Sequence, residues 1–426
     1  MGIRGWLRSL LLVAATAACF SAWGEGWPAA SAPGEVGFNG ARLQALQARL
    51  EQYARDGKIS GGVVMIARHG KVVMHHAFGE RDREAHSQMT TDSVFRIASQ
   101  TKAIISTGIM MLQEQGKLVI GDPVANYLPE FAQTTVAVKR DDGSYDVVKA
   151  NRQITVHDLL THSSGISYGS GIAADRWEAA GIQGWYFADR NEPIRETVRK
   201  MAALPFDAQP GEKWIYGYNI DILGAIIEVA SGQPLDRFLR ENILDPLGMN
   251  STQFYLPREQ RDRLAVVYSA RDGKLERTAD KGGMVSQGSY VDGPRKSFSG
   301  GAGLLSTAGD YARFLQMMLN GGELDGKRLL SANSVHLMTV DHMKGEATFI
   351  QPGVGFGLGF SVVTDLGARG IPGSLGEFAW GGAYHSTYWV DPVEDMLVVY
   401  LTQTLPAGDV DDFARLRAML YGALTD

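Results

Sequence analysis

Stretches typical of β-strands lie near both ends of this 426-residue chain, whereas most of the middle is helical in pattern. Residues 62–68 and 71–78 are rich in β-branched and apolar side chains and meet at His69-Gly70, which predicts a hairpin. Later in the chain, four more such runs predict strands and one apolar-periodic stretch predicts a final helix: 357–364, 376–380, 384–390 and 396–403, then 410–424. If strands from both ends share one sheet, the region between them is an insertion.

This distribution predicts an α/β (α+β) fold with one discontinuous αβ domain, residues 39–98 and 300–426, that holds a mainly helical domain, 99–299. The αβ domain is expected to open with a helix behind an Asn39 cap. Within the helical region, Asp142-Gly143 separates two β-rich pieces and predicts an inserted hairpin near 134–148. Residues 25–38 are rich in Pro, Ala and Gly and are typical of a linker.

The first residues have the pattern of an export signal. Arg4 and Arg8 precede the apolar run 10–20, which is too short to span a bilayer, and a small-x-small cleavage site ends at Gly24. We therefore predict a signal peptide over 1–24, a periplasmic or secreted protein, and no transmembrane anchor after cleavage. The single cysteine, Cys19, lies in this leader and allows a lipoprotein as the alternative.

Composition excludes some functions and leaves others open. The net charge is −6 and no Lys/Arg run is present, so we expect no nucleic-acid partner. The sequence also predicts no metal and no cofactor. It gives no indication of the oligomeric state.

A serine and a lysine stand three residues apart in Ser99-Gln-Thr-Lys102, before the apolar helical run 103–112. At the start of a helix, this spacing puts the hydroxyl and the ammonium on one face. Burial disfavours the charged form of an amine, and a neutral amine can take a proton from a serine. Backbone N–H groups are free in the first turn and can stabilise an oxyanion. The segment therefore predicts a nucleophile, its proton partner and half of an oxyanion hole.

Two further segments carry polar aromatics or paired glycines. Trp214-Ile-Tyr216-Gly-Tyr218-Asn219 precedes a predicted helix over 220–230, and a tyrosine beside an ammonium can serve as general base or acid. A packed tyrosine with a bonded hydroxyl is the structural alternative. Trp380-Gly381-Gly382-Ala383 closes a β-run. Its glycines fit either a β-bulge or a close approach to a ligand, with the N–H of Ala383 as an oxyanion donor.

Two other patterns have competing interpretations. Leu159-Leu-Thr-His162-Ser-Ser-Gly165 ends a predicted helix, and by its chemistry alone polar capping is the favoured interpretation. Gly165-Ile-Ser167-Tyr-Gly169 matches the nucleophile elbow of α/β-hydrolases, and His385 would suit that order of catalytic residues. The elbow needs a buried strand before the serine and a helix after it, and neither is predicted here. We therefore expect Ser99, and not Ser167, to be the nucleophile.

Together these motifs resemble the serine β-lactamase and penicillin-binding protein superfamily, in the branch with class C β-lactamases, D-alanine carboxypeptidases and family VIII carboxylesterases. The resemblance covers about residues 40–420 and rests on Ser99–Lys102, Leu159–Gly165, Pro210-Gly211, Trp214-x-Tyr216, Pro246–Met249, Gly300–Leu304 with Ser306-Thr307, and Trp380–Gly382. It implies an antiparallel sheet flanked by helices, with a helical insertion. It also implies that Ser99 is acylated, Lys102 is its proton partner, Tyr216 is the base, and the N–H groups of Ser99 and Ala383 form the oxyanion hole.

The chain departs from the β-lactamases of this branch in two places. Tyr218 stands where they carry Asn, with Asn219 one residue late, and Trp380-Gly381-Gly382 replaces their Lys-Thr-Gly. That lysine binds the substrate carboxylate, so its loss disfavours anionic substrates. Trp-x-Gly instead resembles the family VIII esterases. We therefore expect an exported serine hydrolase that cleaves short neutral esters. The expected oxyanion or substrate-binding residues, besides Ser99 and Ala383, are Trp380, Gly381, Gly382, Tyr218 and His385, with His385 at the mouth.

Two alternatives stay open at this point. Within the same fold, the chain could be a β-lactamase or a D-amino-acid peptidase that acts on cell-wall material. A non-enzymatic scaffold is the other alternative, and the intact Ser99, Lys102 and Tyr216 argue against it. The expected partner is a small-molecule ester or amide.

Overall fold

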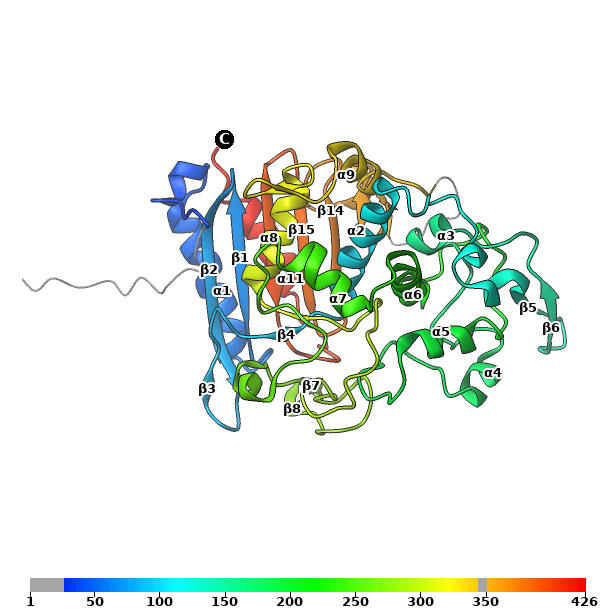
Figure 1. Ribbon diagram of the computed structural model, residues 1–426. Helices are drawn as coiled ribbons and strands as arrows, with labels where there is room; N and C mark the ends of the chain where they lie inside the picture. The colour runs from blue at the N-terminus through cyan, green and yellow to red at the C-terminus, as the bar shows by residue number, and fades with distance from the viewer. Residues whose placement is uncertain (1–26, 344–350) are drawn as a thin grey trace, which may run out of the picture.

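An eight-stranded antiparallel sheet forms the centre of the computed structural model, which describes residues 27–343 and 351–426 (Figure 1). The predicted leader, with Cys19, lies outside the described residues. The strand order is β12-β13-β14-β15-β16-β1-β2-β3. The strands are β1 (Gly61–Arg68), β2 (Lys71–Asp82), β3 (Ser87–Gln88), β12 (Val354–Phe356), β13 (Ser361–Val363), β14 (Phe378–Gly382), β15 (Ser386–Asp391) and β16 (Met396–Leu401).

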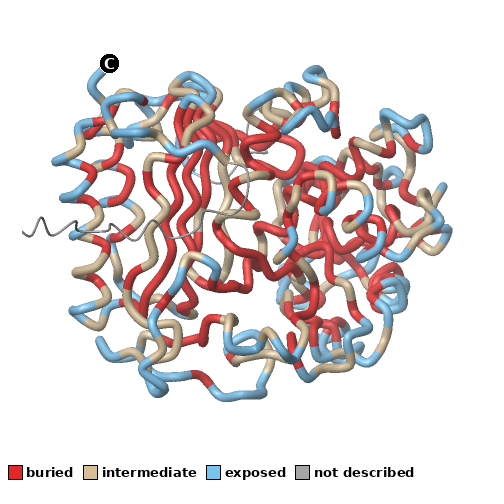
Figure 2. Tube along the Cα trace, turned by 60° about the vertical axis from the view of Figure 1, so that its left-hand side comes forward, coloured by how far each residue is buried: buried red, intermediate tan, exposed pale blue. Residues whose placement is uncertain are grey.

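The two ends of the chain meet in the middle of this sheet, where β1 pairs with β16 and Val63 lies opposite Leu401. Side chains alternate between two hydrophobic clusters: Val63 belongs to one and Val64 to the other. Helices cover both faces, so all of β1 is buried (Figure 2). The outer face packs against α1 (Gly40–Arg55) and α11 (Asp412–Tyr421), and the inner face against α8 (Ala308–Leu319).

The inner-face cluster continues into a helical region, where α2 (Thr101–Glu114) packs against α6 (Asn219–Ser231). The other α-helices are α3 (Val156–Leu160), α4 (Ala174–Ala179), α5 (Ile194–Met201), α7 (Leu235–Leu239), α9 (Ala332–Met338) and α10 (Leu366–Arg369). Short 3₁₀ turns are η1 (Pro33–Val36), η2 (Ala98–Gln100), η3 (Val124–Asn126), η4 (Pro129–Gln133) and η6 (Arg258–Arg263), and η5 (Arg240–Leu244) is a π-helical turn.

Four two-stranded sheets complete the described residues: β4 (Phe95–Arg96) with β9 (Leu305–Ser306), β5 (Thr135–Lys139) with β6 (Tyr145–Lys149), β7 (Tyr268–Arg271) with β8 (Lys274–Arg277), and β10 (Glu323–Leu324) with β11 (Lys327–Arg328). The β4–β9 pair ties the chain just before Ser99 to the chain just after Gly303. It thereby holds the start of α2 against the loop 299–304.

Several predicted elements are present with small shifts at their ends. The Asn39 side chain caps α1 by accepting from the Arg42 N–H, His69-Gly70 joins β1 to β2, and Asp142-Gly143 lies in the turn of the β5–β6 hairpin. The stretch expected to be a linker instead packs on the sheet, because Val36 and Phe38 are buried in the outer-face cluster. The strand predicted over 357–364 is present only as β13, Ser361–Val363, and residues 357–360 are not part of a strand.

Residues 354–363 form two strands, β12 and β13, with a turn between them. Gly359 has a φ of +94°, and a Cβ there would come within 2.5 Å of the Ser106 Oγ. Only glycine fits this turn, so the apolar run cannot continue as one strand. The β7–β8 hairpin was missed, although Asp272-Gly273 at its turn is a hairpin signal.

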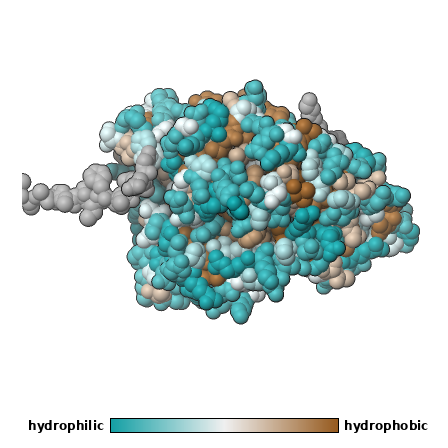
Figure 3. Space-filling model, in the orientation of Figure 1, coloured by the Kyte–Doolittle hydropathy of each residue, from teal (hydrophilic) through white to brown (hydrophobic). Residues whose placement is uncertain are grey.

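No helix in the described ranges is both long and apolar enough to cross a membrane. On the face drawn in Figure 3, hydrophilic residues predominate and the apolar ones form small groups.

Candidate active site

Ser99 lies in η2, the tight turn that leads into α2. The preceding residue, Ala98, is fully buried and has a φ of +44°, an uncommon conformation for a residue with a Cβ. Such strain persists only where the surroundings enforce it, and it clusters at functional sites. Here it turns the chain from β4 into α2 and puts Ser99 at the start of the helix.

Lys102 lies in the first turn of α2 and is 1% exposed. Its Nζ donates to three oxygens: Ser99 Oγ at 3.1 Å, Tyr168 OH at 3.1 Å and the Gly301 carbonyl at 2.8 Å. Among the described residues, no carboxylate forms an ion pair with it. The amine is therefore held in place by neutral acceptors, within reach of the Ser99 proton.

Two tyrosines flank the Lys102 side chain. Its Nζ lies 4.5 Å from the centroid of the Tyr216 ring, a cation–π contact, and the Tyr168 ring stands edge-on to Tyr216. Burial, with the neighbouring Tyr216 and then Asp221, raises the pKa of Tyr168 well above its usual value. Tyr168 is thus a neutral hydroxyl that can accept from Lys102 and donate its own proton elsewhere.

Tyr168 was not singled out as a site residue in the sequence, because it lies in the loop that follows α3 and no spacing rule links it to Lys102. Its flanking glycines are the available signal. Gly165 and Gly169 both have positive φ, and a Cβ on Gly165 would come within 2.1 Å of the Ala208 carbonyl oxygen. These glycines let the loop fold back toward α2.

Trp380 lies in β14, and its indole Nε1 donates to the Tyr216 hydroxyl at 3.0 Å. This bond orients Tyr216 and leaves the phenolic proton free to point elsewhere. The indole N–H is therefore occupied and is not available to a substrate carboxylate.

The glycines after Trp380 bring β14 against the turn that carries Ser99. A Cβ on Gly382 would lie 2.5 Å from the Ile97 carbonyl oxygen, and a Cβ on Gly381 would lie 2.8 Å from the Ser386 carbonyl oxygen. Larger residues would push the strand away. Ala383 packs in a small cluster with Ala98, so its backbone runs beside the nucleophile turn.

Tyr218 lies in the core, behind Tyr168, which corrects the expectation that it contacts the substrate. It is fully buried, and its hydroxyl donates to the Gly184 carbonyl at 2.8 Å. Its ring stands edge-on to Tyr168 at 5.1 Å. The side chain is directed inward because Trp177 stacks on its other side. Tyr218 therefore supports the tyrosine that contacts Lys102.

Asn219 and His162 form the layer beneath Tyr216. The Asn219 amide lies 2.9 Å from His162 Nδ1, and its oxygen accepts from Ser164 Oγ at 2.6 Å. The His162 ring packs 4.7 Å from that of Tyr216. Burial, and secondarily the charge of Lys102, lowers the pKa of His162 well below 6.5, so the imidazole is neutral. The segment 159–165 thus does more than cap α3, because its His162 ring packs against Tyr216 and holds that ring in place.

His385 does not line the mouth, which corrects the sequence expectation. Its Nε2 lies 2.8 Å from the Asp412 carboxylate, and its ring stacks on Phe413 at 4.2 Å. Both partners belong to α11, on the outer face of the sheet, so the side chain points away from Lys102.

The segment around Ser167 lacks the geometry of a nucleophile elbow. α3 ends at Leu160 and α4 begins at Ala174, and the described residues between them form turns. The Ser167 Oγ accepts from the Gly169 N–H at 3.2 Å. No strand presents this serine, which therefore serves the local turn.

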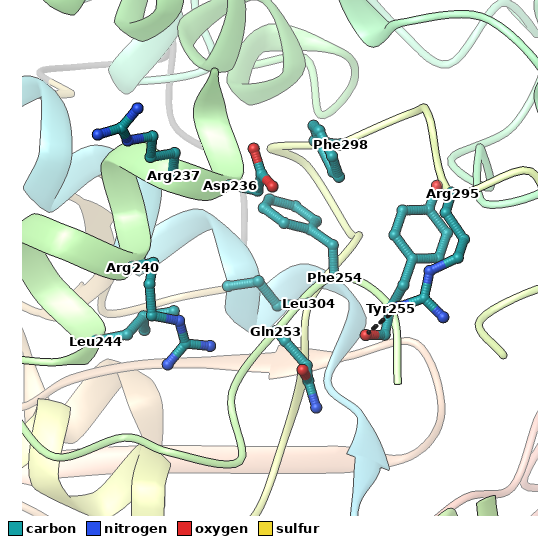
Figure 4. Close-up of a pocket in the computed structure, with 10 residues that line it drawn as sticks. All are labelled: Asp236, Arg237, Arg240, Leu244, Gln253, Phe254, Tyr255, Arg295, Phe298 and Leu304. Carbon is teal, nitrogen blue, oxygen red and sulfur yellow. Dashed lines mark hydrogen bonds between the residues drawn. The ribbon is translucent and has the colours of Figure 1, made fainter. Parts of the chain in front are cut away.

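A cavity of about 380 Å³ lies on the far side of the loop 299–304 and contains neither Ser99 nor Lys102 (Figure 4). Arg237 from α7 and Arg240 from η5 line it, but they pair with Glu241 and Asp245, respectively. Arg295 donates to the Leu256 carbonyl at 3.0 Å. Because its cations already have partners, the cavity offers no evident catalytic group.

The described residues contain no cluster of three or more His, Cys, Asp or Glu side chains placed to hold a metal ion. The chemistry available at this site is that of a hydroxyl, an amine and two phenols.

Comparison with known proteins gives a consistent family. The β-lactamase family model matches residues 46–422. Esterase EstB of Burkholderia gladioli is 33% identical over 394 residues, which cover 88% of this chain and 94% of EstB. A protein of Escherichia coli K12 with the provisional name D-alanyl-D-alanine carboxypeptidase is 29% identical over 399 residues, 87% of this chain and 84% of its own.

Solved structures agree with the sequence comparisons. EstCE1, described as a hydrolase with promiscuous acyltransferase activity, superposes with a TM-score of 0.79 at 28% identity and covers 90% of this chain and 99% of its own. The predicted α/β fold, an antiparallel sheet flanked by helices, is confirmed by these neighbours. The chain belongs to the β-lactamase family and is a serine hydrolase of that family.

Proposed function

We propose that this protein is an exported carboxylesterase that cleaves short neutral esters through an acyl-Ser99 intermediate. The observation that carries the proposal is the 3.1 Å hydrogen bond between Lys102 Nζ and Ser99 Oγ, within a buried site. Esterase EstB, which is 33% identical to this chain, supports ester hydrolysis as the class of reaction.

The proposed reaction follows from this geometry. In the reacting form Lys102 is the neutral amine and its lone pair accepts the Ser99 O–H. Ser99 Oγ attacks the ester carbonyl as its proton passes to Lys102 Nζ, and the N–H groups of Ser99 and Ala383 stabilise the oxyanion. The proton then returns to the leaving alcohol through Tyr216 or Tyr168, both of which contact the ammonium. Water then attacks the acyl carbonyl and gives one proton to Lys102 or its tyrosine partner. The bond between the acyl carbon and Ser99 Oγ breaks, Ser99 takes that proton back, and the acid is released. The sequence predicted an amine–phenol pair, Lys102 with Tyr216, as the base, and Lys102 is the member of that pair that is hydrogen-bonded to Ser99.

The surroundings of Tyr216 favour a neutral, apolar acyl group. The rings of Trp214 and Phe356 lie 5.7 Å apart, and Trp380 lies 5.4 Å from Phe356. Aromatic rings offer apolar contact area, and the N–H of Trp380 is already bonded to Tyr216. A carboxylate would find no lysine at position 380.

The test is substrate preference of the purified enzyme. We expect kcat/KM for p-nitrophenyl butyrate to exceed that for nitrocefin and for a D-Ala-D-Ala dipeptide. The E. coli relative makes peptidase activity the alternative. If nitrocefin or the dipeptide is cleaved faster than the ester, the β-lactamase or peptidase alternative replaces this proposal.

We also propose that residues 1–24 direct export and are removed. Expression of the full chain in a Gram-negative host, followed by mass determination of the periplasmic protein, should give an N-terminus at Glu25. A product cleaved before Cys19 that carries lipid, and that a Cys19→Ser variant no longer forms, would indicate a lipoprotein. A cytoplasmic product with an intact N-terminus would contradict export.

A further inference from the structure

A buried carboxylate stands directly behind the residue that holds Lys102. Asp221, in the first turn of α6, is 1% exposed. Its Oδ1 accepts from Ser299 Oγ at 2.6 Å and from the Gly301 N–H at 3.0 Å. The carbonyl of the same Gly301 accepts from Lys102 Nζ at 2.8 Å. One residue thus connects the carboxylate to the amine.

The loop 299–304 is fitted closely around this carboxylate. A Cβ on Gly301 would come within 2.4 Å of Asp221 Oδ2, and one on Gly300 would lie 2.5 Å from the Ile220 carbonyl oxygen. The Oδ2 atom itself is buried and has no hydrogen-bond partner among the described residues. An unbonded buried carboxylate oxygen is costly, so a structural role in holding the loop does not by itself account for an acid at this position.

We propose that Asp221 is a positioning residue that fixes the Gly301 carbonyl and acts as the buried counter-charge to Lys102, an inference that rests on the proposed function. When Ser99 attacks, its proton makes Lys102 an ammonium, and a nearby negative charge stabilises that form. The geometry also keeps the charge one residue away from Nζ, so that Lys102 is not locked in an ion pair.

The titratable groups that face Lys102 are Tyr168 and His162 from the chain after α3, Tyr216 from the segment before α6, and Asp221 from α6 itself. Of these four groups, Asp221 is the one with a carboxylic acid side chain. The pKa of Asp221 is raised overall, because burial outweighs the hydrogen bonds from Ser299 and Gly301 and then the charge of Lys102, which act to lower it.

The experiment is the pH profile of kcat/KM for p-nitrophenyl butyrate in wild type and Asp221→Asn. The amide oxygen can still accept from Ser299 and Gly301, so the loop is retained while the charge is lost. We expect kcat to fall about tenfold to a hundredfold with little change in KM, since only charge developed during the reaction is affected. The acidic limb should move to lower pH, because the site has lost a negative charge that favours its protonated form.

Asp310→Asn is the matched control. Asp310, in the first turn of α8, is also a carboxylate whose pKa is raised by burial. It accepts hydrogen bonds from the Ser251 N–H and the Thr252 hydroxyl, and among the described residues it forms no hydrogen bond with Lys102 or Gly301. Its variant should keep the wild-type profile. If Asp221→Asn does not fold, Ser299→Ala should give a smaller shift in the same direction, because the carboxylate then loses a donor that stabilises its charge.

An acidic limb that stays in place in folded Asp221→Asn, or in folded Ser299→Ala if that variant has to be used, would overturn the counter-charge. A failed proposed function would be recognised differently, by Ser99→Ala keeping its esterase activity. The two results can therefore be told apart.

Discussion

Buried cations have different partners on the two faces of the central sheet: a carboxylate on the outer face and neutral oxygens on the inner face. On the outer face, the Arg417 guanidinium binds Glu377 with both of its terminal nitrogens, at 2.7 and 2.8 Å, and Arg369 binds the same carboxylate at 2.8 Å. Glu377 is fully buried there. On the inner face, Lys102 is equally buried but is held by a serine, a tyrosine and a carbonyl.

This difference separates a structural charge from a reactive one. A bidentate pair fixes its geometry and keeps both groups ionised, so it can join β14 to α11 but cannot exchange a proton. An amine with neutral acceptors and an aromatic face can gain and lose its proton without breaking an ion pair. The comparison predicts that removing a cation will affect activity on one face and stability on the other.

The largest expected effect is that of Lys102→Ala. Because this amine is proposed to take the Ser99 proton, its loss should lower kcat for p-nitrophenyl butyrate by about 10²–10⁴-fold. The urea midpoint should change little, because no ion pair is broken. A variant that keeps more than about a tenth of wild-type kcat would remove Lys102 from the mechanism.

Arg417→Met is the counterpart on the outer face. It leaves Glu377 buried with one arginine fewer and removes the guanidinium 4.3 Å above the Trp389 ring. We expect the free energy of unfolding to fall by about 3 kcal/mol while kcat stays within about twofold of wild type. A loss of kcat with unchanged stability would show that the outer-face cluster is not merely structural.

Trp380→Phe should have an intermediate effect on kcat. It keeps the apolar ring but removes the N–H that donates to Tyr216 at 3.0 Å. With the phenol less well oriented, kcat should drop about tenfold and KM should change less. Adding Tyr216→Phe to Trp380→Phe should then lower kcat by a smaller factor than Tyr216→Phe does in wild type. Independent, additive losses would mean that the indole does not act through Tyr216.

The smallest expected effect concerns pH and stability. Because the pKa of His162 is lowered well below 6.5 in the folded protein, the unfolded chain binds the extra proton as pH falls below about 6.5. Folding free energy should therefore be lost toward acid, at up to about 1.4 kcal/mol per pH unit for this group.

Urea unfolding between pH 7 and pH 5 checks this prediction. His162→Phe keeps a ring beneath Tyr216 and should show a flatter decline than wild type. His86→Gln, at a side chain 87% exposed, is the control and should follow the wild-type curve. Identical declines in wild type and His162→Phe would rule out His162 as a contributor.

Local patterns in the sequence were sufficient for features set by neighbouring residues. The hairpin at His69-Gly70 and the one-turn spacing of Ser99 and Lys102 depend only on backbone geometry. The burial of Tyr218 and the outward direction of His385 depend on which helices pack nearby. The local sequence around each residue does not contain that information. The contact of Tyr168 with Lys102 joins residues 66 positions apart and depends on a loop folding back.

The site of the covalent adduct tests the central claim most directly. The protein is treated with a fluorophosphonate, digested, and the modified peptide is sequenced by mass spectrometry, with folded Ser99→Ala and Ser167→Ala run in parallel. The account predicts one adduct on Ser99, its loss in Ser99→Ala, and its retention, together with most of the esterase activity, in Ser167→Ala. An adduct on Ser167, or full labelling and activity in folded Ser99→Ala, would contradict it.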